Sequence, residues 1–395
     1  MRRWASIASV LGSCLLLVAC PFVESPPLPP LASVVPGPGH SLALDEVGHG
    51  WAWGHDWDGQ LGVGGSVFPK HRVLPTAVRM PRGVRFTRLA AASSHSLALD
   101  QEGNAWAWGS NLLGQLGDGT TRDGRTTPVR VAAPAGVVFT AIAATASYSL
   151  ALDQHGAAWA WGANDDGWPD DGAWVRRAPA LVSVPVGVTF ASVAAGGGAM
   201  ATFSLALDQA GNAWAWGRNT CGQLGDGSFE PQDAPAPVTM PADASFTMLS
   251  AGADHVLALD EDGNAWAWGC NDALQLGHDD VARHPEPVAV TMPEGVSLVS
   301  VSAGEQSSLA LDDLGRAWQW GRIYQDGPAG TTVDTTGTPV LVDVPTGVGF
   351  VAAAATGHVL ALDGEGTAWS WGNNLFGQLG DGSLFPRGTP ARVGR

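Results

Sequence analysis

A pair of tryptophans that recurs seven times constrains the fold more than any other feature of this sequence. The two residues are separated by one position and followed by glycine, as in the segment Trp51-Ala52-Trp53-Gly54. The first tryptophan of each pair falls at Trp51, Trp106, Trp159, Trp214, Trp266, Trp318 and Trp369. The intervals are 55, 53, 55, 52, 52 and 51 residues, and repeats of this period are typical of solenoids or propellers.

Each repeat unit contains four short apolar segments separated by turn residues. In the second unit these segments start at Phe86, Leu97, Trp106 and Val129, and the outermost segments of the chain match at 31–34 and 389–393. Four strands in a repeat of about 50 residues fit a β-propeller blade. We therefore predict an all-β fold, a seven-bladed β-propeller with four antiparallel strands per blade, as a single domain over residues 31–395.

The paired tryptophans are expected to form the core between blades. In an extended strand Trp51 and Trp53 point to one face and Ala52 to the other, while Leu42 and Leu44 share a face of the preceding strand. A bulky face packed against a small face fills the wedge between two blades. Fourteen of the 18 tryptophans belong to these pairs, so we assign them to packing rather than to binding.

The charge balance and the composition exclude two broad classes of protein. The chain has 37 acidic and 20 basic residues, a formal net charge of −17, whereas a nucleic-acid binder needs a basic field to neutralise phosphates. Hydrophobic residues make up 45% of the chain, which argues against intrinsic disorder. We expect a folded protein that binds no nucleic acid.

The first 30 residues carry targeting signals. Arg2 and Arg3 precede an uncharged stretch from 4 to 18, and a Leu-Val-Ala-Cys motif ends at Cys20. This order is typical of a secretory signal, and the motif resembles the bacterial lipobox, in which the cysteine is lipidated. We predict a signal peptide at 1–19, lipidation at Cys20 and a proline-rich tether at 20–30. An ordinary signal peptide or an uncleaved anchor is the alternative.

A loop rich in asparagine and glycine follows each tryptophan pair. It reads Asn-Leu-Leu-Gly-Gln-Leu-Gly-Asp-Gly at 111–119 and recurs at 219–227 and 374–382. Together with the His-Ser-Leu-Ala-Leu-Asp segment before each pair, it resembles the regulator of chromosome condensation repeat family over residues 31–395. The resemblance implies a seven-bladed propeller. The family includes a nuclear guanine-nucleotide exchange factor, repeats within ubiquitin ligases and receptors, and a secreted bacterial inhibitor of β-lactamases, so the fold alone leaves function open.

Three segments depart from the family pattern. Unit three, at 164–172, loses the Gln-Leu-Gly stretch. Unit six, at 321–327, is shortened and lacks the asparagine, and an insertion lies between Gly196 and Ser204.

No catalytic or metal-binding constellation stands out. The acidic loop of unit three invites a calcium interpretation, but Asp171-Gly172 occupies a turn position where these residues are simply good turn formers. The repeated Leu-Ala-Leu-Asp motif is similar to a sialidase Asp box, yet its Asp–Gly spacing is one residue too long. We predict no enzyme, no cofactor and no metal.

Four histidines occupy one repeat position: His40, His95, His255 and His358. Equivalent positions on separate blades diverge, whereas zinc ligands must converge on one point. The other units have Tyr148, Phe203 and Ser307 there. Replacement by aromatic residues favours a packing slot.

Cys221 and Cys270 lie in the same loop of units four and five. With the signal removed and Cys20 lipidated, they are the remaining pair of cysteines. We predict a disulfide that staples the two blades, two thiols too far apart being the alternative.

The loop after the tryptophan pair also carries variable, bulky residues. The candidates for partner binding are Trp57, Leu112, Leu113, Trp168, Trp174, Tyr324, Leu375 and Phe376. A propeller gathers equivalent loops on one face, and exposed aromatic side chains dominate interface energetics. We predict that this face binds a protein, capping of the blades being the alternative interpretation.

The function predicted from these observations is a monomeric, lipid-anchored protein-binding scaffold or inhibitor, exported to the bacterial cell envelope. Guanine-nucleotide exchange on a small GTPase, implied by the resemblance, is the alternative, although GTPases and GTP are cytoplasmic. A polysaccharide-processing or sialidase-like enzyme is a third and weaker hypothesis.

Overall fold

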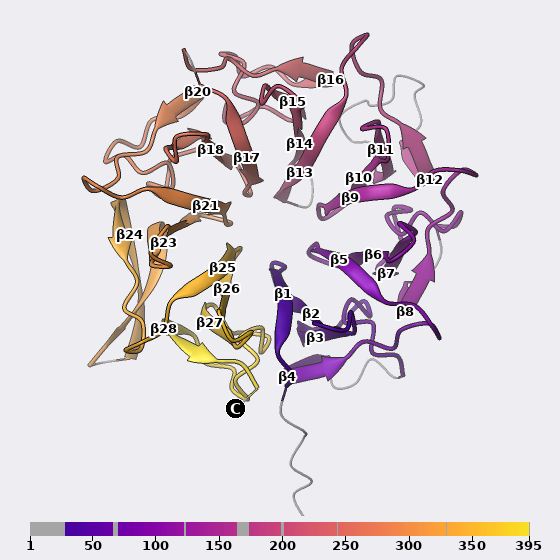
Figure 1. Ribbon diagram of the computed structural model, residues 1–395, viewed down its shortest axis with the longest axis horizontal. Coiled ribbons are helices and arrows are strands. Elements are labelled where there is room, and N and C mark those ends of the chain that lie inside the picture. The colour runs from indigo at the N-terminus through magenta and orange to yellow at the C-terminus, as the bar shows by residue number, and fades with distance from the viewer. Residues whose placement is uncertain are drawn as a thin grey trace, which may run out of the picture.

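Seven small β-sheets surround a central axis in the computed structural model (Figure 1). The structure describes residues 28–394 except for 66–69, 122–123, 164–173, 199–200, 243 and 329. Each sheet has four antiparallel strands that follow one another in chain order from the centre to the rim. The predicted seven-bladed β-propeller is confirmed.

The first four blades are built from the strands with the following bounds. Blade 1 contains β1 (Leu31–Pro36), β2 (His40–Asp45), β3 (Gly50–His55) and β4 (His71–Ala77). Blade 2 contains β5 (Phe86–Ala91), β6 (His95–Asp100), β7 (Ala105–Gly109) and β8 (Arg125–Arg130). Blade 3 contains β9 (Phe139–Ala144), β10 (Tyr148–Asp153), β11 (Ala158–Ala163) and β12 (Val175–Leu181). Blade 4 contains β13 (Phe190–Gly198), β14 (Ala201–Asp208), β15 (Ala213–Gly217) and β16 (Gln232–Pro237).

The remaining three blades have the same order of strands. Blade 5 contains β17 (Phe246–Ala251), β18 (His255–Asp260), β19 (Ala265–Gly269) and β20 (His284–Ala289). Blade 6 contains β21 (Leu298–Ala303), β22 (Ser307–Asp312), β23 (Ala317–Gly327) and β24 (Gly330–Leu341). Blade 7 contains β25 (Phe350–Ala355), β26 (His358–Asp363), β27 (Ala368–Gly372) and β28 (Arg387–Arg392).

The core lies between blades because the inner strands are covered on both faces. The second strand of blade 1 is buried along its whole length, which explains why it is not alternately polar. The second tryptophan of every pair is fully buried, and Trp108 of blade 2 packs in one cluster with Leu42 and Ala52 of blade 1. The first tryptophan of the pair is less enclosed, since Trp51 and Trp106 are only partly buried.

The ring closes by packing between the first and last blades. Each of these blades is complete with strands from its own end of the chain. Leu31 and Trp53 share an apolar cluster with Leu360 and Val393. The backbone N–H of Leu31 donates to the carbonyl of Gly366 at 2.9 Å. Leu28, which the sequence analysis assigned to the tether, also packs against this cluster.

Two segments that depart from the repeat form longer hairpins. The unit-six segment was expected to be a shortened loop, but it extends β23 and β24 as a ladder that runs from the pair Trp318–Leu341 to the pair Gly327–Gly330. The expectation of a loop was wrong because the segment gains a ladder of backbone hydrogen bonds. The carboxylate of Asp326 accepts the backbone N–H groups of Gly388 and Thr389, so the hairpin is held against β28.

The second departure is the insertion before Ser204. It lengthens the hairpin of β13 and β14 as far as the pair Gly198–Ala201. Within the part of the chain that the structure describes, no helix is long and apolar enough to cross a membrane.

Candidate functional site

In the five units that have it, the Gln-Leu-Gly stretch of the loop joins one blade to the next. In blade 2 the backbone carbonyl of Gln115 accepts two hydrogen bonds from blade 3, one from Trp161 Nε1 at 2.9 Å and one from Ser149 Oγ at 2.8 Å. Leu116 is fully buried, and Gly117 has a φ of 63°. A Cβ atom on Gly117 would lie 2.7 Å from the Trp161 ring, so this position requires glycine for two reasons.

The four histidines at one repeat position also bridge neighbouring blades, across contacts that we call seams. His95 Nε2 lies 2.9 Å from Ser149 Oγ, and that hydroxyl already donates its hydrogen to Gln115. The histidine must therefore donate through Nε2, which in the neutral ring is the tautomer protonated at that nitrogen. Burial lowers the pKa of His95 to about 3. The histidines thus hold blades together, and the described residues contain no cluster of metal ligands.

We call the residue at the histidine position of each repeat the slot residue. It is matched to the residue that it contacts on the next blade. Histidine or tyrosine faces serine, in the pairs His40–Ser96, His95–Ser149, Tyr148–Ser204, His255–Ser308 and His358–Ser41. Where blade 4 has Phe203, blade 5 has Val256 in the same apolar cluster. At the seam between blades 6 and 7 the residues are Ser307 and Val359, and no large side chain fills the slot.

The aspartate of the Leu-Ala-Leu-Asp motif has a structural role. Asp153 Oδ1 accepts the backbone N–H groups of His155 and Ala157, and its Oδ2 accepts Trp159 Nε1 at 2.9 Å. Although partial burial of the carboxyl opposes this, the hydrogen bonds hold the pKa of Asp153 below its usual range. The motif therefore forms the turn between two strands and anchors the first tryptophan of the pair.

Cys221 and Cys270 are joined by a disulfide that links the loop of blade 4 to the end of β19 in blade 5. Their Cα atoms are 5.0 Å apart, and both residues are buried.

The connections after the first and third strands of every blade lie at one end of the ring, which we call the loop face. Most of the predicted binding residues belong to the third-strand connection, and several are exposed: Trp57 by 57%, Leu112 by 72%, Trp174 by 74% and Leu375 by 66%. Leu113 and Phe376 are exposed by 38% and 37%. Trp168 and the acidic loop of unit three lie outside the described residues, and so does Cys20.

Two of the predicted residues meet at the seam between blades 7 and 1. The ring centroid of His55 lies 5.4 Å from that of Trp57 and 4.7 Å from that of Phe376. The ammonium group of Lys70 lies 4.3 Å from the centroid of the Trp57 ring, within range of a cation–π interaction. We call Trp57, His55 and Phe376 the aromatic cluster.

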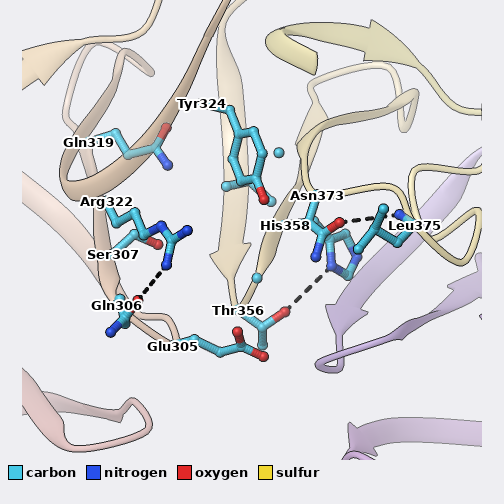
Figure 2. A pocket seen from close by; sticks show the side chains of 13 residues that line it. Glu305, Gln306, Ser307, Gln319, Arg322, Tyr324, Thr356, His358, Asn373 and Leu375 are labelled. Carbon is cyan, nitrogen blue, oxygen red and sulfur yellow. Dashed lines mark hydrogen bonds between the residues drawn. The ribbon is translucent and has the colours of Figure 1, made fainter. Parts of the chain in front are cut away.

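A polar cavity of about 300 Å³ lies on the same face, between blades 6 and 7. We call it the seam cavity. Figure 2 shows Gln319, Arg322 and Ser307 on one wall, His358, Asn373 and Leu375 on the other, and Tyr324 and Glu305 between them. The structure thus brings Tyr324 and Leu375 into one site, although Tyr324 belongs to β23 rather than to a loop.

Two groups of the cavity have perturbed acidity. Burial raises the pKa of Glu305, and the charge of Arg322 partly opposes that effect. Burial also raises the pKa of the Tyr324 hydroxyl. Arg322 Nη1 donates to Gln306 Oε1 at 3.0 Å, which fixes the guanidinium on its wall.

A second cavity, of about 610 Å³, occupies the centre of the ring and opens toward the first-strand connections. Alanine, glycine and serine line most of it, and Asp254 and Glu305 are its acidic residues. Burial raises the pKa of Asp254 as well.

Sequence reasoning missed several residues of the loop face. Phe229 and Phe385 are exposed by 47% and 77%, and both follow a third strand as Trp57 does, so the loop position was the signal for them. Glu305 and Arg322 could not be found in this way, because only the fold brings the first-strand connection of blade 6 close to the extended end of β23.

The sequence of this chain is similar to a family of known proteins. The model of the RCC1-like domain matches residues 18–358. The ultraviolet-B receptor UVR8 of Arabidopsis thaliana is 30% identical over 296 residues, which are 74% of this chain and 65% of the receptor. The guanine nucleotide exchange factor SRM1 of Saccharomyces cerevisiae is 27% identical over 378 residues, 82% of this chain and 77% of that protein.

Solved structures show the same likeness. The structure of Prp20p from Saccharomyces cerevisiae, described with its binding properties to Gsp1p and histones, superposes with a TM-score of 0.75 at 25% identity. It covers 93% of this chain and 87% of that one. The chain matches just under two thirds of the length of the plant receptor and 6% of the ubiquitin ligase HERC2 of Mus musculus. These relatives are eukaryotic.

Proposed function

This chain belongs to the RCC1-like domain family, and from that premise we propose that it is a non-catalytic scaffold that binds a protein through its loop face. The observation that carries the proposal is the set of exposed apolar side chains on consecutive blades of that face. They are Leu375 and Phe385 on blade 7, Trp57 on blade 1, Leu112 on blade 2, Trp174 on blade 3 and Phe229 on blade 4. Aromatic side chains in such a patch supply much of the binding energy of protein interfaces.

The interior supports this proposal because its unusual residues already have structural roles. The seam histidines hold neighbouring blades together, and the repeated aspartates form turns. Among the described residues, the third-strand connections, the seam cavity and the central cavity carry varied side chains, and all three reach the loop face.

The test is a matched pair of surface variants. Replacing Trp57, Leu112 and Leu375 together by Ala should weaken capture of the partner from the native source by at least about 100-fold, since each side chain of a hot spot contributes ~1–2 kcal/mol or more. The control replaces Val47, Val138 and Leu314, which are exposed on the connections of the opposite face. Equal capture by both variants would exclude the loop face.

We further propose that the protein acts at the cell envelope, held by a lipid on Cys20, where it serves as a scaffold for its partner or as an inhibitor of it. The signal-like residues 1–19 support this. Fractionation with mass measurement of the N-terminus tests it, because a cytosolic protein that retains residues 1–19 would contradict it.

Guanine-nucleotide exchange is the second candidate, favoured by the match to SRM1 over most of both chains. An exchange factor accelerates release of a fluorescent GDP analogue from a purified small GTPase. Accelerated release that the loop-face variant abolishes would favour this function over a passive scaffold.

A further inference from the structure

The seam cavity exists because blade 6 lacks two features of the repeat. Its slot residue is Ser307, where the other seams have histidine, tyrosine or phenylalanine. It also lacks the Gln-Leu-Gly loop, whose carbonyl would accept the indole of the next blade. Gln319 replaces that carbonyl, since its Oε1 accepts Trp371 Nε1 at 3.1 Å. The position of Gln319 is alanine in five of the other units and serine in blade 7.

This substitution leaves an amide donor facing the cavity. Gln319 is only 8% exposed, and its Nε2 donates no hydrogen bond to any residue that the structure describes. Asn373 uses its Oδ1 to accept the backbone N–H of Leu375, and its side-chain nitrogen likewise finds no acceptor within the described chain. Both amide groups are open to the cavity, so a ligand with acceptor atoms can accept hydrogen bonds from them.

The cavity also presents one charge of each sign. Arg322 lies on the wall with Gln319, and Glu305 lies where the two walls meet (Figure 2). The guanidinium has further N–H groups beyond the one on Gln306, and such groups bind a carboxylate more strongly than a neutral acceptor. The partly desolvated carboxylate of Glu305 would gain from a cation beside it.

We propose that the seam cavity binds a small zwitterion of the α-amino acid type. The carboxylate of the ligand accepts hydrogen bonds from Arg322 and Gln319, and its ammonium group faces Glu305. The volume of about 300 Å³ is at the lower end of ligand pockets, which suits a single amino acid. Leu375 and Val359 supply apolar surface for its side chain. The cavity shares Leu375 with the proposed protein-binding patch, but binding of an amino acid requires no protein partner.

The direct test measures binding of each of the twenty L-amino acids to the full chain by thermal shift and by calorimetry at millimolar concentration. At least one should bind and raise the melting temperature, because a ligand of the native state stabilises it. Isovalerate and isobutylamine are the analogues of valine that lack its ammonium group and its carboxylate, and each should bind at least about tenfold more weakly than valine. Absence of binding by all twenty, or equal binding of isovalerate, would overturn the proposal.

The chain itself offers a variant that closes the cavity. Ser307→Phe reproduces at this seam the Phe203–Val256 pair of the seam between blades 4 and 5, because Ser307 faces Val359. It should abolish binding while circular dichroism stays that of a folded propeller. Undiminished binding would place the ligand elsewhere and overturn the proposal.

Two charge variants keep the proposal testable even if the larger side chain disturbs folding. Arg322→Gln and Glu305→Gln should each weaken binding by about tenfold or more. Arg218→Gln is the matched control, because Arg218 holds the same position in blade 4. Equal affinities for all three variants would show that the charges of the cavity do not hold the ligand.

Discussion

Mild acid should unfold this propeller, because four fully buried histidines are neutral in the fold. Burial lowers the pKa of His40, His95, His255 and His358 from 6.5 to about 3. In the unfolded chain the same groups take up a proton near pH 6.5. The unfolded state therefore binds more protons below that pH, and stability falls as the pH falls from 6.5 toward 3.

The magnitude follows from the number of sites. Each histidine contributes about 1.4 kcal/mol of lost stability per pH unit in this window, so four contribute about 5.5 kcal/mol per unit. Two pH units would remove about 11 kcal/mol, which is comparable to the whole stability of an ordinary domain. Asp56, Asp254 and Glu305 oppose this loss at the acid end, because their raised pKa values let the folded state take up protons there.

Urea unfolding at a series of pH values from 7 to 5 measures the loss of stability due to the histidines, because ordinary carboxyl groups take up protons at lower pH. The slope of the free energy of unfolding against pH should approach four protons per molecule. His95→Tyr should reduce that slope by one proton, since tyrosine fills the same slot in blade 3 and bonds to the next serine there. Val131→Ala, a buried change nearby, should lower stability at every pH and leave the slope unchanged.

A slope of less than one proton would refute the reasoning, as would an unchanged slope in the His95→Tyr protein. Either result would mean that the histidines are charged in the folded state or that the slot admits water.

Three further predictions concern the seams and are checked by urea unfolding. Gly117→Ala should cost about 2–4 kcal/mol, because it combines a left-handed backbone with a clash against the next blade, whereas Gly136→Ala, at a φ of 84° in open space, should cost about 1 kcal/mol. Similar losses in both would show that the close approach does not matter. Reduction of the Cys221–Cys270 bond should lower stability by about 2–4 kcal/mol and expose two thiols to alkylation under denaturing conditions, and two thiols already alkylated in the untreated native protein would contradict the disulfide. Gln319→Ala should cost about 1–3 kcal/mol by leaving a buried indole N–H without its acceptor, and a neutral result would mean that water replaces the amide.

The sequence was sufficient to predict the blades because each blade corresponds to one repeat unit. The spacing of the tryptophan pairs set the number of blades, and the alternation of large and small residues set the faces of the strands. The slot of His95 could also be recognised as a packing position, because tyrosine and phenylalanine replace histidine in other units.

The seam cavity could not be predicted, for a reason that is spatial. Glu305 lies in the first-strand connection of blade 6, Arg322 lies in β23 of the same blade, and Asn373 belongs to blade 7. The unit-six segment lacks the loop motif, and absence of a motif did not indicate that β23 and β24 would continue as a hairpin. The contacts of the seam serines could not be predicted either, because each partner lies in the preceding blade of the ring, some 50 residues away in most cases and 317 residues away for Ser41.

The matched pairs at the seams restrict which blades can be neighbours. Suppose that the second strands of blades 5 and 6 were exchanged. Phe203 of blade 4 would then contact a serine in place of Val256, and His255, now in blade 6, would contact Val359. The buried serine and histidine would both lose their hydrogen-bond partners. The contact His358–Ser41 that closes the ring is of the same kind as His40–Ser96. A circular permutant, with the present ends joined and new ends at another seam, would therefore keep these contacts between blades. Exchange of the second strands of blades 5 and 6 would lose them.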